Sequence, residues 1–411
     1  MNRPQLQHYS PQKLFDREGP HLVVAGQTLM DIAGQCGPTP LYIYSKQAIN
    51  DRIAALKAAL PARVHLHYAV KANPMQEVID YVAEQVHGLD VSSGNELKAA
   101  LQSGIRAQNI SFAGPGKSLQ ELKAAIAADI TLNVESEVEF TRILSLCEET
   151  GQVARVALRI NPDFELRASG IKTSGGPQPF GVDAEAAPEL LEKISTSAVE
   201  FRGFHIFSGS QVLQAKTLIE AHRKTFALAK QLADHAQVPV QTLNIGGGFG
   251  IPYFPGDAPL EVAPVMEHLE GLLTEYRETF AETQIILELG RYLVGEAGLY
   301  MARITDRKVS RGTTYLVTDG GLHHHLAASG NFGQALRRNY PITIGNKLGG
   351  HTETVTVVGP LCTPLDMLAK DMDLPKAEIG DLLVVFQSGA YGYSASPLEF
   401  LSHPRPREIL V

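Results

Sequence analysis

Tryptophan is absent from this chain of 411 residues, and cysteine is scarce. The three cysteines, Cys36, Cys147 and Cys362, are odd in number and widely spaced, which argues against a disulfide framework and for a reducing compartment. Long apolar runs are missing too, both behind the N-terminus and at the length that a bilayer span requires. We therefore expect a cytoplasmic protein that is neither secreted nor inserted into a membrane.

Positive charge is also in short supply. The chain has 36 Lys and Arg against 44 Asp and Glu, a net charge of −8, and it contains no basic run. Such a surface repels polyanions on average, so the composition argues against a nucleic-acid partner and favours a small molecule. The length favours two domains with large buried cores.

From about residue 45 onward, short apolar runs alternate with longer amphipathic segments, which is the pattern of βα units. The eight predicted strands are Val64–Lys71, Gly88–Ser92, Asn109–Ala113, Ile130–Val134, Arg155–Asn161, Gly203–Phe207, Thr242–Gly246 and Ile285–Leu289. Apolar spacing of three and four residues predicts helices at Gln47–Leu60 and Ala215–Ala233. Eight βα units predict a closed (β/α)8 TIM barrel over residues 45–297.

After residue 297 the pattern changes to strands separated by turns, such as Thr314–Thr318, His351–Val358 and Asp381–Phe386. We therefore expect a second, mostly antiparallel β-domain over residues 298–411. Residues 1–44 contain the further strand candidates Leu22–Val24 and Pro40–Tyr44, which we expect to join its sheet.

The run His67–Pro74 places Lys71 at the end of an apolar strand, just before a helix-starting turn. Strand ends of a barrel point into its active-site mouth, where partial desolvation frees a lysine amine to react with an aldehyde. The alternative is an ordinary solvated loop lysine. Lys71 is therefore a candidate Schiff-base nucleophile.

A glycine-rich segment, Asn244–Gly250, follows the seventh predicted strand. Without side chains, Gly247 and Gly248 let backbone N–H groups close around a phosphate, although a simple tight turn is the alternative. The eighth strand ends in Glu288, and a buried carboxylate there needs a cationic partner. Arg291 and a protonated pyridine nitrogen are the two candidates, and the second, with Lys71, indicates pyridoxal 5'-phosphate (PLP).

In their order along the chain, these motifs resemble the fold type III PLP-dependent decarboxylases, the family of the diaminopimelate and ornithine decarboxylases. The resemblance spans nearly the whole chain and rests on Tyr68–Asn73, Asn244–Gly250, Glu288–Tyr292, Gly359–Cys362 and Gly389–Tyr391. It implies an α/β fold with an alanine-racemase-like barrel and a β-domain. It also implies a homodimer with shared active sites.

Carried over to this sequence, the resemblance implies that Lys71 forms an aldimine with the cofactor and that Glu288 contacts the pyridine nitrogen. The other implied cofactor contacts are Asp90, Arg159, Ser210, Gly247, Gly248, Gly290, Arg291 and Tyr391. For Asp90, and for Glu96 nearby, the alternative is a charged turn that caps the next helix. For Arg159 the alternative is a partner carboxylate.

Two positions depart from the family. Where relatives have a histidine that stacks on the cofactor ring, this chain has Phe207, and His205 lies two residues earlier on the same strand face, so either side chain could cover the ring. Where relatives have an acidic residue after the cysteine, this chain has Thr363, which cannot pair with a distal ammonium group.

The remaining substrate-binding candidates are Asp366, Arg338 and Tyr340. The sequence Cys362–Asp366 looks more like members linked to exosortase gene clusters, and like those that decarboxylate an aminoacyl group held on an acyl carrier protein. The expected partner is therefore a small amino-acid-like substrate, either free or bound to a carrier.

A lone cysteine is often a small buried hydrophobe, and Cys36 and Cys147 fit that interpretation. For Cys362 the resemblance implies a proton donor that acts after carbon dioxide leaves. The consecutive histidines His323–His325 project in different directions, so we expect no metal site there and interpret the run as a loop near the substrate mouth.

We therefore expect a PLP-dependent α-decarboxylase that resembles diaminopimelate decarboxylase, with Lys71 and Cys362 as catalytic residues. An amino-acid racemase on the same fold is the alternative, although racemases lack the motif around Cys362. A non-enzymatic PLP carrier would typically lack the β-domain.

Overall fold

The computed structural model describes residues 11–164, 171–172, 175–332, 334 and 337–411. The chain forms two compact units. Among the described residues, the β unit comprises those in the ranges 11–52, 252–259 and 291–411, and the barrel unit those in the ranges 53–251 and 260–290. The predicted domain boundaries at 44/45 and 297/298 differ from these divisions and stay predictions.

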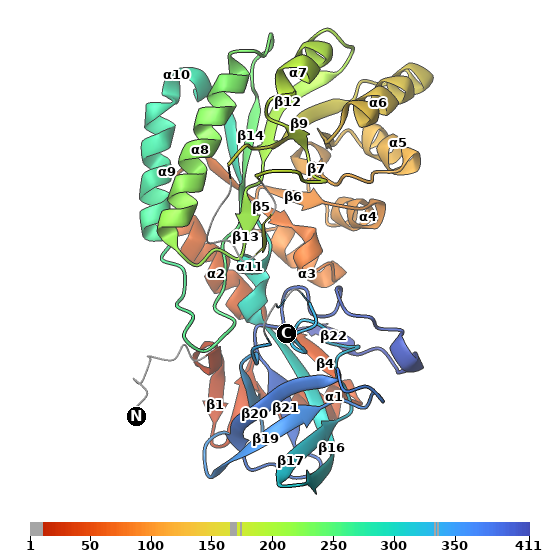
Figure 1. The fold of residues 1–411 in the computed structure, drawn as a ribbon, viewed down its shortest axis with the longest axis vertical. Coiled ribbons are helices and arrows are strands. Elements are labelled where there is room, and N and C mark those ends of the chain that lie inside the picture. The colour runs from red at the N-terminus through yellow and green to blue at the C-terminus, as the bar shows by residue number, and fades with distance from the viewer. Residues whose placement is uncertain (1–10, 165–170, 173–174, 333, 335–336) are drawn as a thin grey trace. The chain divides into compact units, whose positions relative to one another are not determined.

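Parallel strands close into a barrel, which confirms the predicted fold (Figure 1). They are β5 (Val64–Ala69), β6 (Gly88–Val91), β7 (Ile110–Phe112), β8 (Thr131–Val134), β9 (Arg155–Asn161), β12 (Glu200–Ile206), β14 (Thr242–Gly247) and β15 (Gln284–Leu289). The pairings of β15 with β5 and of β8 with β9 close the ring. The short strand β11 (Val182–Asp183) extends β9, and β10 (Ile171–Lys172) pairs with β13 (Gly209–Ser210).

Helices precede the first barrel strand or lie between the strands in sequence, and they pack around the barrel (Figure 1). They are α2 (Lys46–Ala59), η2 (Val70–Ala72), α3 (Gln76–Ala83), α4 (Gly94–Gln102), η3 (Ala107–Asn109), α5 (Leu119–Ala127), α6 (Glu137–Thr150), α7 (Ala187–Ser195), α8 (Ala215–Ala233), α9 (Ala263–Glu275) and α10 (Arg277–Phe280). Ser93, Ser118 and Ser136 each accept the backbone N–H three residues later, so serine N-caps fix where α4, α5 and α6 begin.

One strand end differs from the prediction in a way that matters for the site. We expected the first barrel strand to run to Lys71, but β5 ends at Ala69 and Lys71 lies in the 3-10 turn η2. The backbone N–H of Asn73 donates to the carbonyl oxygen of Val70 at 3.1 Å. This bond turns the chain, so Lys71 leaves the sheet earlier than its apolar neighbours suggest.

The β unit contains a mixed sheet in the order β18-β21-β16-β17-β19-β20, with β4 paired to both β16 and β22. Its strands are β4 (Leu41–Tyr44), β16 (Gly298–Ser310), β17 (Thr313–Thr318), β18 (Ile342–Ile344), β19 (Thr352–Val358), β20 (Met367–Pro375), β21 (Leu382–Val385) and β22 (Arg407–Leu410). Most neighbours are antiparallel, while β17–β19 and β22–β4 are parallel. The predicted mostly antiparallel domain is therefore confirmed.

The N-terminal strands follow the prediction in part. Strand β4 joins the large sheet as expected. Strand β2 (His21–Val24) instead forms a separate sheet with β1 (Asp16–Glu18) and β3 (Gln27–Thr28). A short turn connects β2 to β3, so local hairpin pairing satisfies its backbone groups. The remaining elements of this unit are η1 (Pro11–Leu14), α1 (Leu29–Cys36), α11 (Arg291–Val294), η4 (Gly295–Ala297) and η5 (Phe400–Ser402).

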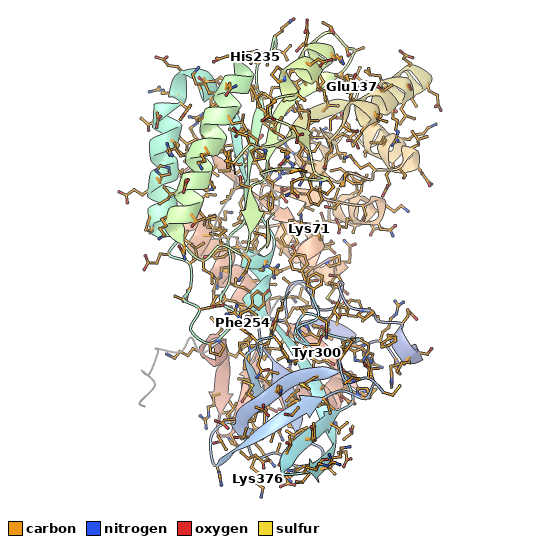
Figure 2. All side chains as sticks on the ribbon, in the orientation of Figure 1. Lys71, Glu137, His235, Phe254, Tyr300 and Lys376 are labelled. Carbon is orange, nitrogen blue, oxygen red and sulfur yellow. The ribbon has the colours of Figure 1, made fainter. Side chains whose placement is uncertain are left out.

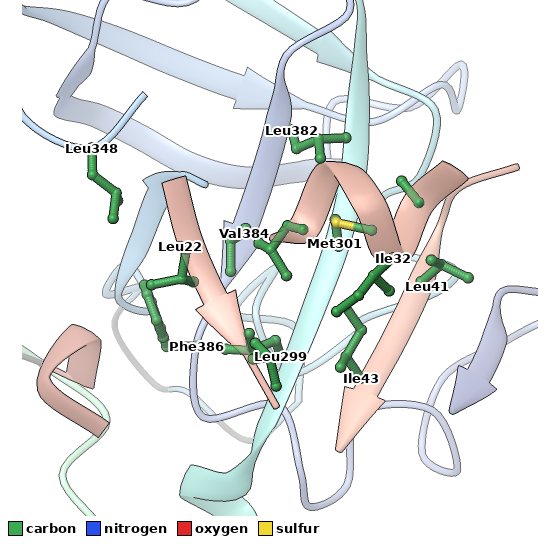
Figure 3. Packing of buried hydrophobic residues seen from close by; sticks show 13 residues of the cluster. Leu22, Ile32, Leu41, Ile43, Leu299, Met301, Leu348, Leu382, Val384 and Phe386 are labelled. Atoms are coloured by element: carbon green, nitrogen blue, oxygen red, sulfur yellow. The ribbon is translucent and has the colours of Figure 1, made fainter. Parts of the chain in front are cut away.

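A hydrophobic cluster unites the two ends of the chain within the β unit (Figure 3). Leu22 from β2, Ile32 from α1 and Ile43 from β4 pack with Met301 and Val384 from the later strands. Burying each such side chain contributes roughly 1.5–3 kcal/mol. This packing explains why the N-terminal segment belongs to the β unit. In the part of the chain that the structure describes, no helix is both long and apolar enough to cross a membrane.

Candidate active site

Lys71 lies directly after β5, at the C-terminal end of the barrel strands (Figure 2). Its side chain is 44% exposed, and its Nζ lies 3.8 Å from Oε1 of Glu288, near the end of the neighbouring strand β15. Glu288 is buried. The structure therefore brings together the lysine and the carboxylate that the sequence identified separately. The amine of Lys71 is accessible, and the carboxylate of Glu288 that faces it is buried.

Two side chains hold the other carboxylate oxygen of Glu288. Oε2 accepts a hydrogen bond from Nδ2 of Asn244 at 3.3 Å and lies 3.2 Å from Nε2 of His205. Burial alone raises the pKa of Glu288, but His205 and Lys71 outweigh it and hold the pKa of this carboxyl well below its usual range. Glu288 is thus a fixed negative charge in a buried position.

The contacts of His205 and Phe207 separate the two candidates for the ring-covering residue. His205 is buried, and its Nε2 faces Glu288. The centroid of the Phe207 ring lies 5.8 Å from Nζ of Lys71, within the range of a cation–π contact. This geometry favours Phe207 as the residue next to the cofactor ring and His205 as the partner of Glu288.

The glycines at the end of β14 form a backbone cradle. Gly246 and Gly248 have φ of +68° and +78°, conformations that favour glycine. A Cβ on Gly247 would lie 1.9 Å from the carbonyl oxygen of Glu288. A Cβ on Gly248 would lie 2.3 Å from the carbonyl oxygen of Gly209. The segment is therefore a tight turn in which neighbouring backbone occupies the space that side chains would need, and phosphate contact by its N–H groups stays a prediction.

Two more predicted cofactor contacts lie against these elements. Ser210 is in β13, and its Cα would be 3.7 Å from a Cβ on Gly248. Gly290 lies against η2, where a Cβ would be 2.9 Å from that of Ala72 and 3.2 Å from that of Ala69. Glycine at position 290 therefore lets the end of β15 approach the turn that carries Lys71.

Asp90 is buried inside the barrel at the end of β6. Its Oδ1 accepts a hydrogen bond from Ser111 and lies 3.4 Å from Nδ1 of His67. The neighbouring acidic residue, Glu96, lies in the first turn of α4, and its Oε2 accepts the N–H of Ser92, just before the helix, at 2.7 Å. The helix-capping alternative thus holds for Glu96, while cofactor contact by Asp90 stays a prediction.

Arg159 has the partner carboxylate that the sequence analysis left open. Its Nη1 donates to Oε1 of Glu135 at 2.8 Å. Burial raises the pKa of Glu135, but Arg159 and Lys117 outweigh this and lower it. Lys117 is itself buried and lies 2.9 Å from Oε1 of Glu139. The sequence analysis missed Glu135, although it follows β8 directly and the strand-end rule applied elsewhere would have selected it.

The β unit brings together three other predicted residues. The guanidinium carbon of Arg291 lies 4.6 Å from the ring centroid of Tyr391, and its Nη1 donates to the hydroxyl of Tyr253 at 2.7 Å. The Tyr340 ring lies 4.9 Å from that of Tyr253. Tyr253 was missed by the sequence analysis, although it closely follows the glycine segment.

Arg338 has contacts of its own in the β unit. Its guanidinium carbon lies 3.7 Å from the ring centroid of Phe254, which is labelled in Figure 2, and its Nη1 lies 3.8 Å from Oδ1 of Asp257. The side chain is still 57% exposed. Arg338 is therefore oriented by neighbours and accessible, and its contact with substrate stays a prediction.

Cys362 is exposed, so the buried-hydrophobe interpretation does not apply to it. Cys147 is buried and Cys36 packs against the hydrophobic cluster, as expected for these two. Thr363 is half-buried, and its hydroxyl accepts the N–H of Leu365 at 3.3 Å. Asp366, in contrast, is buried.

The histidine run His323–His325 is a buried turn of the β unit. Nε2 of His325 lies 2.9 Å from Oγ of Ser388, and Nε2 of His324 lies 2.9 Å from the carbonyl oxygen of Pro404. The structure shows a buried turn whose histidines contact the core of this unit, and the expected place of this loop near a substrate mouth stays a prediction. Within the described ranges, no group of three His, Cys, Asp or Glu side chains is arranged to hold a metal ion.

The barrel residues fit PLP. An accessible amine, a buried carboxylate beside it, an aromatic face near the amine and a glycine turn that leaves no room for a Cβ all lie at the C-terminal ends of the barrel strands. These groups match the aldehyde, the pyridine nitrogen, the ring face and the phosphate of that molecule.

Comparison with known proteins agrees with this chemistry. A family model described as pyridoxal-dependent decarboxylase, pyridoxal binding domain, matches residues 46–295. The chain is 36% identical over 379 residues to the L-glutamyl-[BtrI acyl-carrier protein] decarboxylase of Niallia circulans, and the alignment covers 90% of this chain and 88% of that protein. It is 32% identical over 409 residues to the diaminopimelate decarboxylase of Aquifex aeolicus, with coverage of 99% and 94%.

A solved structure extends the likeness to three dimensions. Diaminopimelate decarboxylase from M. jannaschii, in complex with L-lysine, matches with a TM-score of 0.89 and 27% identity over 98% of this chain and 93% of that chain. These relatives are decarboxylases, so the racemase alternative is not favoured.

Proposed function

The chain belongs to the pyridoxal-dependent decarboxylases, and from this membership we propose that Lys71 is the residue that carries the cofactor. The enzyme uses PLP to release carbon dioxide from an amino acid or an aminoacyl substrate. The assignment rests above all on the accessible amine of Lys71, which lies 3.8 Å from the buried carboxylate of Glu288.

PLP supplies an electron-accepting ring for the electron pair that remains when carbon dioxide leaves. Glu288 would keep the pyridine nitrogen protonated, because its negative charge is buried and its Oε2 is already occupied by Asn244 and His205. Phe207, next to Lys71, would cover the ring face, and the glycine turn after β14 would offer N–H groups to the phosphate.

Cys362 supplies the proton that replaces the lost carboxylate on the substrate Cα. The support for this role is its exposed thiol and its place in the motif Gly359–Cys362. A thiol that is held close to the substrate Cα can act as a general acid.

The proposed substrate is an aminoacyl group held on a carrier protein. Thr363 follows the cysteine, and this neutral residue suits a distal end without charge. Linkage to a carrier turns a distal carboxylate into a neutral ester. The 36% identical relative is named for such a substrate, whereas the 32% identical relative is named for free diaminopimelate.

Carbon dioxide release by the purified, PLP-loaded protein tests this proposal. Glutamyl-loaded acyl carrier protein and meso-diaminopimelate should be compared at equal concentration, and release from the first alone is expected. Release from meso-diaminopimelate alone would refute the carrier substrate and keep the decarboxylase. Lys71→Ala should lose turnover by several orders of magnitude, as loss of a covalent catalyst does, while Lys123→Ala should not.

A cytoplasmic homodimer with shared active sites is also part of the proposal. The support is the family membership and the three free cysteines, which suit a reducing compartment. Light scattering on the loaded protein should give twice the chain mass. A mixture of Lys71→Ala and Cys362→Ala subunits should regain activity if the sites are shared.

A further inference from the structure

The carboxylate of Asp366 holds the segment 359–366, here called the Cys362 loop. Its Oδ1 accepts the backbone N–H of Leu322 at 2.6 Å, and its Oδ2 accepts that of Leu361 at 2.8 Å. The residue is 3% exposed. Leu361 directly precedes Cys362, so one of the two bonds ends next to the thiol.

The backbone of Asp366 closes the same loop. Its N–H donates to the carbonyl oxygen of Thr363 at 3.2 Å, and its carbonyl oxygen accepts the N–H of Gly359 at 3.1 Å. Asp366 therefore ties the end of the loop to its first residue, Gly359, and to Thr363, while Cys362 stays exposed.

Two glycines make room for this carboxylate. A Cβ on Gly321 would lie 2.1 Å from Oδ1 of Asp366, and one on Gly359 would lie 2.4 Å from Oδ2. Neither glycine has a positive φ, so occupied space, not backbone conformation, excludes a side chain. At Gly321 the three nearest atoms all belong to Asp366, whereas at Gly359 the Cα of Gly321 is also close.

A carboxylate with both oxygens on backbone N–H groups makes charge-assisted hydrogen bonds, which are stronger than neutral ones. Both carboxylate oxygens of Asp366 are therefore occupied by backbone N–H groups, whereas the side chain of Arg338 is 57% exposed. We propose that Asp366 is a positioning residue, which fixes the Cys362 loop on the turn at Gly321 and Leu322, and that it does not contact the substrate. This replaces the substrate-binding role suggested by the sequence, and it rests on the proposed function of Cys362.

Hydrogen exchange tests the contact without any turnover. In Asp366→Asn, an amide NH2 replaces one oxygen, so one of the two backbone N–H groups loses its acceptor. Exchange at Leu322 or Leu361 should then accelerate by about tenfold or more, because a hydrogen bond to a charged group is lost. Asp371→Asn is the matched control, since that aspartate is exposed on β20 and both amides should be unaffected.

A double-mutant cycle tests the packing. Gly321→Ala should lower the melting temperature in the native background, because its Cβ meets the Asp366 carboxylate. In the Asp366→Ala background the same change should have almost no effect, because the obstructing atoms are gone. Equal effects in both backgrounds would overturn the proposal. Gly321→Ala alone also displaces the carboxylate if the Asp366 variants do not fold.

Kinetics then connect the loop to the chemistry. Asp366→Asn should lower kcat with little change in KM, because a displaced proton donor affects the chemical step and not substrate binding. A raised KM with unchanged exchange at both amides would make Asp366 a substrate ligand and overturn the proposal. Faster exchange with unchanged kcat would overturn it as well. Absence of carbon dioxide release by the native protein would instead refute the proposed function, which the exchange and melting data do not require.

Discussion

The Lys117–Glu139 pair of the barrel unit and two charged residues of the β unit, Arg291 and Asp366, are held in different ways. Lys117 and Glu139 have opposite charges and lie 2.9 Å apart. Neutral groups hold the two residues of the β unit. Arg291 donates to a tyrosine hydroxyl at 2.7 Å, and Asp366 accepts two backbone N–H groups.

This difference has energetic consequences. Removing one member of a buried ion pair leaves its partner charged and unpaired, which typically costs about 3–5 kcal/mol. Removing a neutral partner from a charged group costs about 1.5–3 kcal/mol, the value of one hydrogen bond to a charge. We therefore expect loss of Lys117 or Glu139 to cost more than loss of a neutral partner of Arg291 or Asp366.

The largest expected effect is in the barrel unit. Lys117→Met should lower the free energy of unfolding by about 3–5 kcal/mol, because Glu139 is left buried without its cation. The variant also loses hydrogen bonds from Nζ to the carbonyl oxygens of Gly114 and Asn133. Urea denaturation measures the change. The double variant with Glu139→Leu should recover part of the loss, and a cost below about 1 kcal/mol for the single variant would contradict the comparison.

The next effect is the response of the β unit to acid. Burial lowers the pKa of His325 to about 3, against 6.5 for the ordinary side chain. The unfolded chain therefore binds a proton below pH 6.5 that the folded chain does not, so stability is complete above that pH and falls toward about pH 3. The slope for one fully buried histidine is about 1.4 kcal/mol per pH unit.

His325→Gln should reduce the slope only by the share of one histidine, as measured by urea denaturation between pH 6.5 and 4, because burial also lowers the pKa of His323 to about 3 and that of His324 to about 4. His222 in the barrel unit is the matched residue, because burial lowers its pKa to about 4. His222→Gln should flatten the acid response over a shorter range, since its pKa is shifted less. An unchanged slope in both variants would show that neither histidine stays neutral in the folded protein.

A smaller effect is expected from the hydroxyl of Tyr253. Tyr253→Phe keeps the ring next to Tyr340 and removes the hydrogen bond to Arg291. If Arg291 contacts the cofactor phosphate, the dissociation constant of PLP should rise by about tenfold, which corresponds to the loss of one such bond. Equilibrium dialysis of the apoprotein measures it. An unchanged dissociation constant for PLP would show that Arg291 does not contribute to cofactor binding.

The smallest effect is expected at a surface pair of the barrel unit. Lys123 lies 2.7 Å from Glu149, and the two side chains are 54% and 62% exposed. Lys123→Ala should change the free energy of unfolding by no more than about 1 kcal/mol, because solvent screens exposed ion pairs. It serves as the control for Lys117→Met, and an equal cost for both would contradict the role of burial.

Much of the fold follows from local pattern. Strand Arg155–Asn161 and helix Ala215–Ala233 have the same bounds in the prediction and in the structure, because their apolar periodicity is clear along each segment. The end of β5 and the separate sheet of β2 were not predicted correctly. Both depend on which backbone groups pair with each other, and apolar pattern does not encode that.

The residues of the candidate site were likewise predictable only in part. Lys71 and Glu288 were predictable, since both lie at barrel strand ends and the fold brings those ends together. The partners of Arg159 and Arg291 were missed, because the strand-end rule was not applied to Glu135 and because apolar pattern does not show that Tyr253 lies next to Arg291. The burial of Asp366 was equally inaccessible, since a carboxylate in a motif does not reveal whether backbone N–H groups surround it.

Reduction of the PLP-loaded protein with borohydride, followed by digestion and mass spectrometry, tests the central claim most directly. The account predicts a pyridoxyl group on the peptide that contains Lys71 in the native protein, and none in Lys71→Ala. A pyridoxyl group on another lysine, or none in the native protein, would contradict the assignment of Lys71 and with it the proposed site.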